Sequence, residues 1–267
     1  VMEQKPFLPL EEWKHEVIRS GLLGKIVTVA NDFRSYEYHA IAQLRRYLGS
    51  DAKPKQVTAV SRVVSLPSYQ PKQADAKMTA PTTEVWQIAT ITCTNDSLLL
   101  HHMTSAYKTA PIRTLQSLRV YGEKGCIIDD VVTYIDSETG ETVTGRAMSR
   151  YGSMNELLAL DATLSNGKKI SWTNPYSFFN GSDDEISIAS HLLTMAEVVR
   201  GRGEPRYSLD KAITDLKVME AIRLSAAQEG RPVFFSELGP WSRLTRYSSP
   251  QWWKQTIQKI IGKMKRL

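Results

Sequence analysis

The amino-acid sequence predicts an α+β fold, in which a large, mostly antiparallel, open sheet has helices packed on one face, giving two layers. Two observations predict this class. Alternating, β-branched segments follow one another through the middle of the chain, and their connections are short, which favours antiparallel pairing. Helical periodicity lies mainly toward the two ends of the chain, where apolar helix faces can cover the sheet.

The start of the chain predicts a helix, a strand and a second helix. The first helix is expected over about 10–20, before the glycines of SGLLG, from residues at helical spacing: Leu10, Trp13 and Val17. KIVTVANDF then alternates as a strand. From Tyr36 to Leu48 the helical period returns, with an apolar stripe made of Ile41, Leu44 and Leu48.

Strands fill the middle of the sequence. Alternation predicts them in QVTAVSRVV, VWQIATITC, SLLLHHM, LQSLRVY and CIIDDVVTYI, with a turn at GEKG. ELLALDATL and KKISW are expected to pair across residues 165–168, because Asn-Gly is the strongest short-range hairpin signal. The polar, proline-containing stretch 66–83 predicts a long surface loop.

Helices return after the strands. EISIASHLLTMAEVVR predicts a helix that stops at GRG, and a second helix is expected between a Ser208 cap and Gly230. The segment 240–267 predicts a basic amphipathic helical tail with Trp253 and Met264 on its apolar side. We expect this tail to dock within or between subunits. Lying on an anionic membrane is the alternative, which Gly262 disfavours because it weakens an isolated helix.

Composition limits the classes of protein to consider. The chain has 267 residues and 42% hydrophobic content, enough for a substantial core, and we treat 1–267 as a single domain. The formal net charge is +6, but the segment after Glu237 holds seven basic residues and no acidic one, so the remaining body is close to −1. This distribution gives poor support for a nucleic-acid groove, and we expect no nucleic-acid partner.

Location and redox state follow from what the sequence contains. No stretch approaches the ~18 consecutive apolar residues of a membrane span, so we expect a cytoplasmic protein without a membrane partner. Cys93 and Cys126 lie in apolar, strand-like segments and are expected to be reduced. The first residue is Val1, from which we expect a processed chain or a piece of a longer one.

Three stretches together resemble the Gfo/Idh/MocA family of NAD(P)-dependent oxidoreductases. EQKPFLPLEEWKHEVIRSGLLGKI is similar to the beginning of the family's second domain, LRVYGEKGCIIDD to its Gly-x-x-Gly hairpin, and SLDKAITDLKVMEAIRLSAAQEGRPV to its closing helix. The resemblance covers nearly the whole chain but only the family's second half. The Rossmann half, whose glycine-rich turn holds the pyrophosphate, has no counterpart, since the Gly201–Gly203 pair follows a helix and is expected to be a helix stop.

The resemblance implies a function for this half. It would be the substrate-binding and oligomerisation domain of an oxidoreductase that acts on a sugar, polyol or similar hydroxylated compound by hydride transfer. It further implies NAD or NADP in the full-length parent, with no tight cofactor binding and no turnover by this chain alone. The partners would be a small sugar-like molecule and further copies of the chain, associated through the sheet.

The resemblance also indicates a candidate catalytic residue. His39 matches the histidine of the family's Asp-x-x-x-His pair, which faces the nicotinamide and the substrate carbon. Oxidation of a secondary alcohol leaves a carbonyl, so a nearby group must accept the hydroxyl proton, and histidine is suited to that work. Ser35 stands where the family often has aspartate, and it cannot supply the charge that stabilises an imidazolium. The expected substrate-binding residues are Arg34, Tyr36, Tyr38 and Arg46.

Two alternatives remain open for this site. His39 shares a helix face with Ala42, Gln43 and Arg46, which could be an ordinary solvated side of a helix. Ser35 also leaves open a second function, a stand-alone, non-catalytic binding or assembly module derived from the same fold. Glu3-Gln4-Lys5-Pro6 imitates the family's Glu-Lys-Pro motif with an inserted residue, and we do not expect Lys5 to be catalytic.

The remaining candidate residues have simpler interpretations. His101 and His102 are neighbours in a strand, so their side chains point to opposite faces and cannot chelate one metal, and we expect no metal site. Three aromatic residues could line a sugar-sized pocket, although aromatics in strands more often pack in a core or across strands: Trp86, Trp172 and Tyr176.

Overall fold

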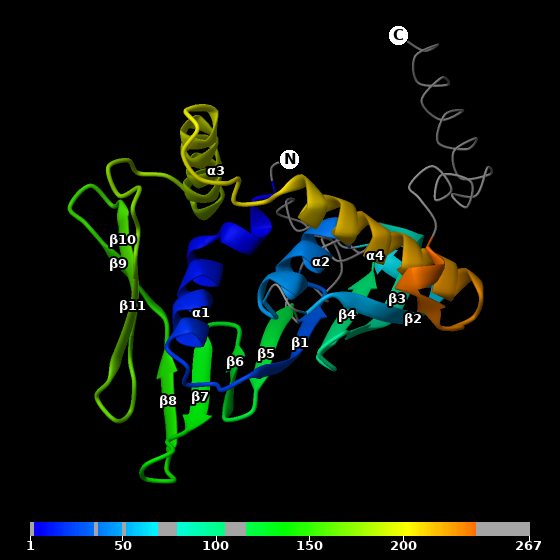
Figure 1. Cartoon of the computed structure of the whole chain (residues 1–267), viewed down its shortest axis with the longest axis horizontal. Helices are drawn as coiled ribbons and strands as arrows, with labels where there is room; N and C mark the ends of the chain where they lie inside the picture. The colour runs from blue at the N-terminus through cyan, green and yellow to red at the C-terminus, as the bar shows by residue number, and fades with distance from the viewer. Residues whose placement is uncertain (1–2, 35–36, 50–51, 69–78, 105–115, 239–267) are drawn as a thin grey trace.

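The structure, a computed structural model, describes residues 3–34, 37–49, 52–68, 79–104 and 116–238 (Figure 1). A nine-stranded sheet runs in the order β12-β2-β3-β4-β1-β5-β6-β7-β8, and a separate three-stranded sheet in the order β11-β10-β9. Neighbouring strands of the large sheet are antiparallel except β1 and β4, which are parallel. The predicted α+β class with a large, mostly antiparallel sheet is confirmed.

The elements have the following bounds. The helices are η1 (Lys5–Phe7), α1 (Pro9–Arg19), α2 (Glu37–Arg46), α3 (Asp183–Val199), α4 (Leu209–Ala227) and η3 (Phe235–Glu237). The strands of the large sheet are β1 (Ile26–Asp32), β2 (Pro54–Ser68), β3 (Thr79–Cys93), β4 (Leu98–Thr104), β5 (Ser117–Gly122), β6 (Gly125–Ile128), β7 (Val131–Ile135), β8 (Thr142–Arg146) and β12 (Val233–Phe234). The small sheet contains β9 (Met148–Tyr151), β10 (Leu157–Thr163) and β11 (Lys169–Thr173).

Helices α1, α2 and α4 cover one face of the large sheet. In Figure 1, α2 and α4 lie over β1 to β4, and α1 lies between the two sheets. Trp13 and Val17 of α1 are fully buried in the core, as is Ile41 of α2. The apolar stripes expected in the first two helices therefore face the sheet, and burial of such stripes is what stabilises short helices.

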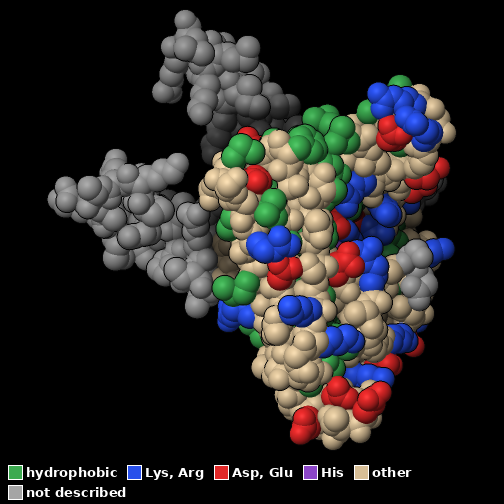
Figure 2. All heavy atoms as spheres, turned by 90° about the vertical axis from the view of Figure 1, so that its left-hand side faces the viewer, with side chains coloured by type: hydrophobic (Ala, Val, Ile, Leu, Met, Phe, Trp, Pro, Cys, Tyr) green, Lys and Arg blue, Asp and Glu red, His purple; other side chains and the backbone are tan. Residues whose placement is uncertain are grey.

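Helix α3 packs only through its N-terminal half. Its buried residues are Ile186, Ser187, Ser190 and His191. Figure 2 shows the side of the molecule with the small sheet and α3, where positive and negative side chains are interspersed and apolar ones gather toward the top, at the height of α3. The outward apolar residues of this helix are Leu192, Leu193, Met195 and Val199. The packed half of α3 holds the N-terminal segment of the chain in place.

Two predictions about strands are wrong in part. The described residues of the expected loop at 66–83 belong to strands, because pairing of β2 with β3 continues to Ser68 and resumes at Thr79, with a register shift between Leu66 and Ser68. Such a bulge accommodates Pro67 within the pairing. Residues 69–78 lie outside the described part of the chain. CIIDDVVTYI forms two strands, not one, because Asp129 adopts φ 55° and turns the chain.

The GEKG hairpin depends on the absence of side chains at its glycines. A Cβ atom on Gly125 would lie 2.3 Å from the carbonyl oxygen of Thr133, and one on Gly122 would lie 2.2 Å from that of Leu23. These positions therefore require glycine for close backbone approach. At the second predicted hairpin, β10 pairs with β11 and Gly167 adopts φ 84°, as the Asn-Gly signal predicted.

The predicted helix ends are confirmed. Ser208 caps α4 by accepting a hydrogen bond from the backbone N–H of Lys211, and Gly201 follows α3 with φ 75°. The tail predicted at 240–267 lies outside the described residues. None of the described helices combines the length and apolar character needed to cross a membrane.

Candidate functional site

A histidine and a buried carboxylate meet at the start of α2. The Nδ1 atom of His39 lies 2.7 Å from Oε1 and 2.9 Å from Oε2 of Glu3. Glu3 is 1% exposed, whereas 26% of the His39 side chain is exposed. Sequence reasoning missed Glu3, because it lies 36 residues from its partner and no helical or strand spacing connects the two.

This geometry prepares His39 to accept a proton. A carboxylate that accepts from Nδ1–H favours the tautomer in which Nε2 is the acceptor. Within the part of the chain that the structure describes, Nε2 of His39 has no hydrogen-bond partner. Ser35 lies outside the described residues, and Glu3 supplies the negative charge that the serine cannot. The arrangement matches a general base held by a carboxylate.

Helix α3 fixes the backbone that carries Glu3. The hydroxyl of Ser187 donates to the carbonyl oxygen of Gln4 at 2.8 Å, and Nε2 of His191 lies 2.9 Å from the carbonyl oxygen of Glu3. Burial is the largest influence on His191 and lowers its pKa, which favours a neutral ring. These two contacts connect residues far apart in the sequence and place the carboxylate against α2.

The helix face that carries His39 is buried. Ala42 is 4% exposed and Gln43 is 2% exposed, so the interpretation of this face as an ordinary solvated side is wrong. The neighbouring Tyr38 is half exposed, and its ring centroid lies 4.0 Å from that of His39. Of the described candidates, Tyr38 is thus brought directly beside the histidine.

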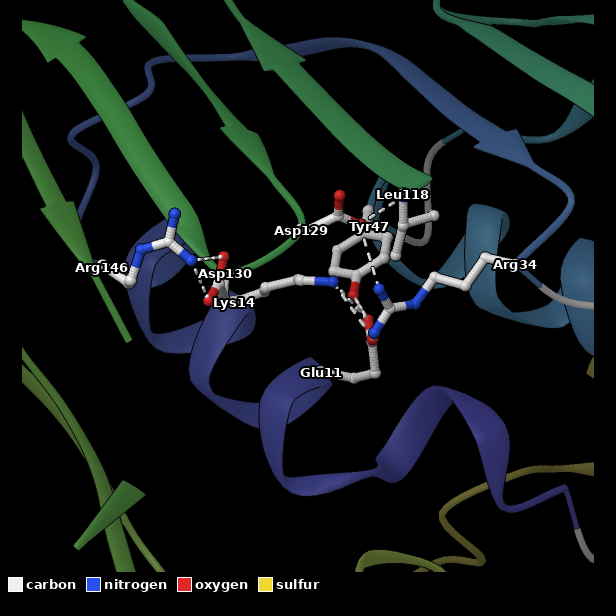
Figure 3. A network of polar contacts seen from close by, with 8 residues as sticks. All are labelled: Glu11, Lys14, Arg34, Tyr47, Leu118, Asp129, Asp130 and Arg146. Carbon is white, nitrogen blue, oxygen red and sulfur yellow. Dashed lines mark hydrogen bonds and ion pairs between the residues drawn. The ribbon is translucent and has the colours of Figure 1, made fainter. Parts of the chain in front are cut away.

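Arg34 belongs to a different cluster, shown in Figure 3. Its Nη1 atom lies 3.0 Å from Oδ1 of Asp129, and its Nη2 atom lies 3.5 Å from Oε1 of Glu11. Glu11 also accepts from the ammonium of Lys14 at 3.1 Å and from the hydroxyl of Tyr47. Two cations and two carboxylates therefore balance one another in this network.

The centre of this network is fully buried. Lys14 and Glu11 are both 0% exposed, and burial lowers the pKa of Lys14 while the carboxylate of Glu11 acts in the opposite direction. Removal of one partner from such a pair leaves an uncompensated charge in the core. The contacts of Arg34 are those of a structural ion pair, and its role toward a substrate stays a prediction.

Arg46 is held near the C-terminal end of α2. Its Nη2 atom lies 3.0 Å from Oε1 of Glu12, its guanidinium lies 4.2 Å from the ring centroid of Phe7, and it donates to the carbonyl oxygen of Pro6. Arg206 shares both partners, at 2.5 Å from Oε1 of Glu12 and 4.6 Å from the Phe7 ring. Burial lowers the pKa of Arg46 to about 10, so it remains charged at neutral pH.

The structure thus separates the predicted site residues. His39 and Tyr38 lie together, Arg34 and Arg46 occupy two further clusters, and Tyr36 lies outside the described residues. A substrate role for each of them remains a prediction. Lys5, which we did not expect to be catalytic, pairs with Asp184 at 3.1 Å.

The two adjacent histidines point to opposite faces of the sheet, as predicted. His101 is buried on the helix side, with Nδ1 at 3.2 Å from Nδ2 of Asn31. His102 accepts from Nε1 of Trp86 at 2.6 Å and lies 3.5 Å from Asp32. Among the described residues no group of three potential ligands could hold a metal ion.

The aromatic candidates do not form one sugar-sized pocket. Trp172 is 8% exposed and belongs to the core, and together with Tyr176 it lines a cavity of about 110 Å³. Ligand sites of drug-sized molecules occupy ~300–1,000 Å³. Trp86 lies against His102. Packing is therefore the main role of Trp172.

The described residues lack the glycine-rich pyrophosphate cradle of a Rossmann dinucleotide site. A pyrophosphate cradle needs a glycine-rich turn between a strand and the N-terminus of a helix. Gly201 and Gly203 instead follow the C-terminal end of α3, with φ 75° and 77°. This part of the chain offers a histidine for proton transfer, and a nucleotide would need other residues to hold its phosphates.

No protein-family model matches the sequence, and no curated protein matches it either. Solved structures match the fold. A candidate myo-inositol dehydrogenase from Sinorhizobium meliloti 1021 is 13% identical with a TM-score of 0.50, and the match covers 86% of this chain and 63% of that one. An oxidoreductase from Thermotoga maritima is 16% identical with a TM-score of 0.50, covering 88% and 62%.

The matches confirm the predicted resemblance at the level of the fold. The chain spans less than two thirds of the length of both proteins. Its fold is that of the matching part of these two oxidoreductases, which agrees with the predicted resemblance.

Proposed function

We propose that this chain is the substrate-binding and oligomerisation domain of an NAD(P)-dependent oxidoreductase that acts on a sugar, polyol or similar hydroxylated compound. The chemistry is oxidation of an alcohol to a carbonyl, with the hydride passing to a nicotinamide held by residues outside those described. His39 would accept the hydroxyl proton at Nε2. Tyr38 would contact the substrate, and the protein would act in the cytoplasm.

The contact of Glu3 with His39 is the observation that carries this proposal. A histidine that merely packs would not need a buried carboxylate on one nitrogen and a partly exposed ring on the other side. The hydrogen bond orients the ring, and the carboxylate stabilises the imidazolium that forms when the proton arrives. The fold agrees with the proposal, since the same domain occurs in the oxidoreductases described above.

The open face of the large sheet supports oligomerisation. Strand alternation places a set of exposed apolar side chains on the face opposite the helices: Val60, Ile88, Leu100, Ile128 and Ile135. Val60 and Ile88 are paired neighbours on this face, and exposed apolar side chains of this kind are typical of protein–protein contacts. A second copy of the chain, packed face to face, would cover it.

The experiment that tests the function uses the longer protein with its nucleotide-binding half. His39→Asn should reduce turnover at saturating substrate by about 10²–10⁴-fold, the usual contribution of a general base, while the affinity for NAD(P)H stays unchanged. Gln43→Asn, a buried change on the same helix face, serves as the control for packing. An unchanged turnover in His39→Asn would return this histidine to a structural role and favour a non-catalytic binding or assembly module.

A further inference from the structure

We propose that a second site, at the C-terminal end of α2, binds the phosphate group of a small phosphorylated ligand. This site is a cavity of about 410 Å³ between η1, α2 and the start of α4. Its volume lies in the ~300–1,000 Å³ range of small-molecule sites. The inference does not depend on the proposed redox function, because neither His39 nor Glu3 lines this cavity.

The cavity wall is strongly basic. Five cationic side chains line it together with one carboxylate: Arg45, Arg46, Lys53, Arg206, Lys211 and Asp215. Two carboxylates pair with the arginines of this wall. Arg45 pairs with Asp215, which also accepts from the hydroxyl of Tyr207, and Arg46 and Arg206 share Glu12.

Two of these cations have no acidic partner among the described residues. Lys53 and Lys211 are exposed, and neither ammonium forms an ion pair within the described part of the chain. Among the described residues, the ion-pair partners of these five cations are two carboxylates, Glu12 and Asp215, so the positive charges outnumber their partners. This surplus suits a dianionic phosphate better than a single carboxylate, and arginine forks with lysines are the usual phosphate ligands.

Two buried nitrogen atoms on the lining residues also have no hydrogen-bond partner. These atoms are Nε of Arg45 and Nε2 of His15. Burial, followed by the charge of Arg46, lowers the pKa of His15 to about 2, so its ring is neutral and can donate from one nitrogen. Buried polar atoms normally have partners, and these two nitrogens have almost no accessible surface, so a bound anion would reach them only after the side chains move.

The remaining walls suit the organic part of such a ligand. Pro6, Phe7, Ala42 and Ala52 give the cavity an apolar side next to its cations. The first turn of α4 also faces the cavity through Lys211, and a helix N-terminus favours anions. A phosphate ester with a compact carbon skeleton therefore matches both parts of the wall.

The test is isothermal titration of the folded chain at low ionic strength with inorganic phosphate, glucose 6-phosphate and glucose. Saturable binding of either phosphate-bearing probe is expected, and glucose should not displace inorganic phosphate. The double variant Lys53→Ala/Lys211→Ala should weaken this binding by about tenfold or more, since it removes two charged donors. Both lysines are exposed, so the variant should fold, which a thermal melt verifies.

A matched control removes two exposed lysines elsewhere. Lys168→Ala/Lys169→Ala changes the net charge equally in the β10–β11 hairpin, and should leave phosphate affinity within about twofold. In parallel, phosphate should shift the imidazole NMR signals of His15 in the wild-type chain and not in the Lys53/Lys211 variant. The proposal is overturned if neither phosphate-bearing probe binds saturably, or if the control variant loses as much affinity as the test variant.

Discussion

Two glutamates near the start of the chain, Glu3 and Glu11, are both buried. They differ in whether the side chains that they contact remain available to react with a substrate. Glu11 is surrounded by Lys14, Arg34 and Tyr47, and its charge is neutralised within the core. Glu3 holds one nitrogen of His39, whose ring is partly exposed. In this chain, a buried carboxylate therefore points to a catalytic role only where its partner keeps a nitrogen available for proton transfer on a partly exposed ring, as His39 does.

The largest expected effect concerns the enclosed glutamate. Glu11→Ala should lower the free energy of unfolding by about 3–5 kcal/mol, because it leaves the ammonium of Lys14 buried without a partner. Urea denaturation of the chain measures it. Glu16→Ala, which removes a surface pair with Arg19, should cost at most about 1 kcal/mol. Equal losses of unfolding free energy in the two variants would contradict the structural role assigned to this buried network.

The second test removes the charge of the other glutamate and leaves its shape. Glu3→Gln in the longer protein should lower turnover by about tenfold or more, since the imidazolium loses its stabilising carboxylate. The free energy of unfolding should change less than in Glu11→Ala, because no buried cation is abandoned. A large loss of stability with full turnover would show that both glutamates are structural.

Acid titration tests the burial of two other histidines, His101 and His15. Burial lowers the pKa of His101 to about 4 and that of His15 to about 2, from 6.5. The unfolded chain therefore binds protons first as the pH falls below 6.5. The stability that the neutral rings provide is complete above that pH and declines below it, by at most about 1.4 kcal/mol per pH unit for each ring.

Thermal melts between pH 7.5 and 5 measure this decline, and the stability curve should be flatter in His101→Asn. Stability that does not depend on pH in this range would contradict the burial of these two rings as neutral groups.

The smallest effect concerns the hydrogen bond by which α3 holds the N-terminal segment. Ser187→Ala removes the hydrogen bond to the carbonyl oxygen of Gln4 and should cost about 1 kcal/mol, with a slightly lower turnover in the longer protein. Ser190→Ala, which removes a bond within α3 itself, should leave turnover unchanged. Identical turnover in both variants would mean that α3 does not position Glu3.

Local patterns predicted most of the fold. The apolar spacing of Trp13 and Val17, the Asn-Gly turn at Gly167 and the Ser208 cap each depend on residues close together in sequence, and each was confirmed. Errors arose where context overrides local preference. The polar, proline-containing stretch 66–83 favours a loop by local preference, but a bulge keeps Pro67 within the pairing of β2 and β3. The separation of β9, β10 and β11 into a second sheet also has no local signal.

The candidate site was only half predictable. His39 could be identified because it lies in a motif of short spacing, and the loss of the family's aspartate at Ser35 was visible. The carboxylate that faces His39 could not be identified, since it depends on contacts of Ser187 and His191 with the N-terminal backbone. The surplus of charge in the basic cavity likewise appears only when α2 and α4 are placed side by side.

The tautomer of His39 tests the central claim most directly. In a long-range ¹H–¹⁵N spectrum of the imidazole rings at neutral or higher pH, the neutral form should carry its proton on Nδ1, with Nε2 unprotonated, because the carboxylate of Glu3 accepts from Nδ1. Glu3→Met should abolish this preference. A ring protonated on Nε2, or a tautomer mixture identical in the wild type and in Glu3→Met, would contradict the account.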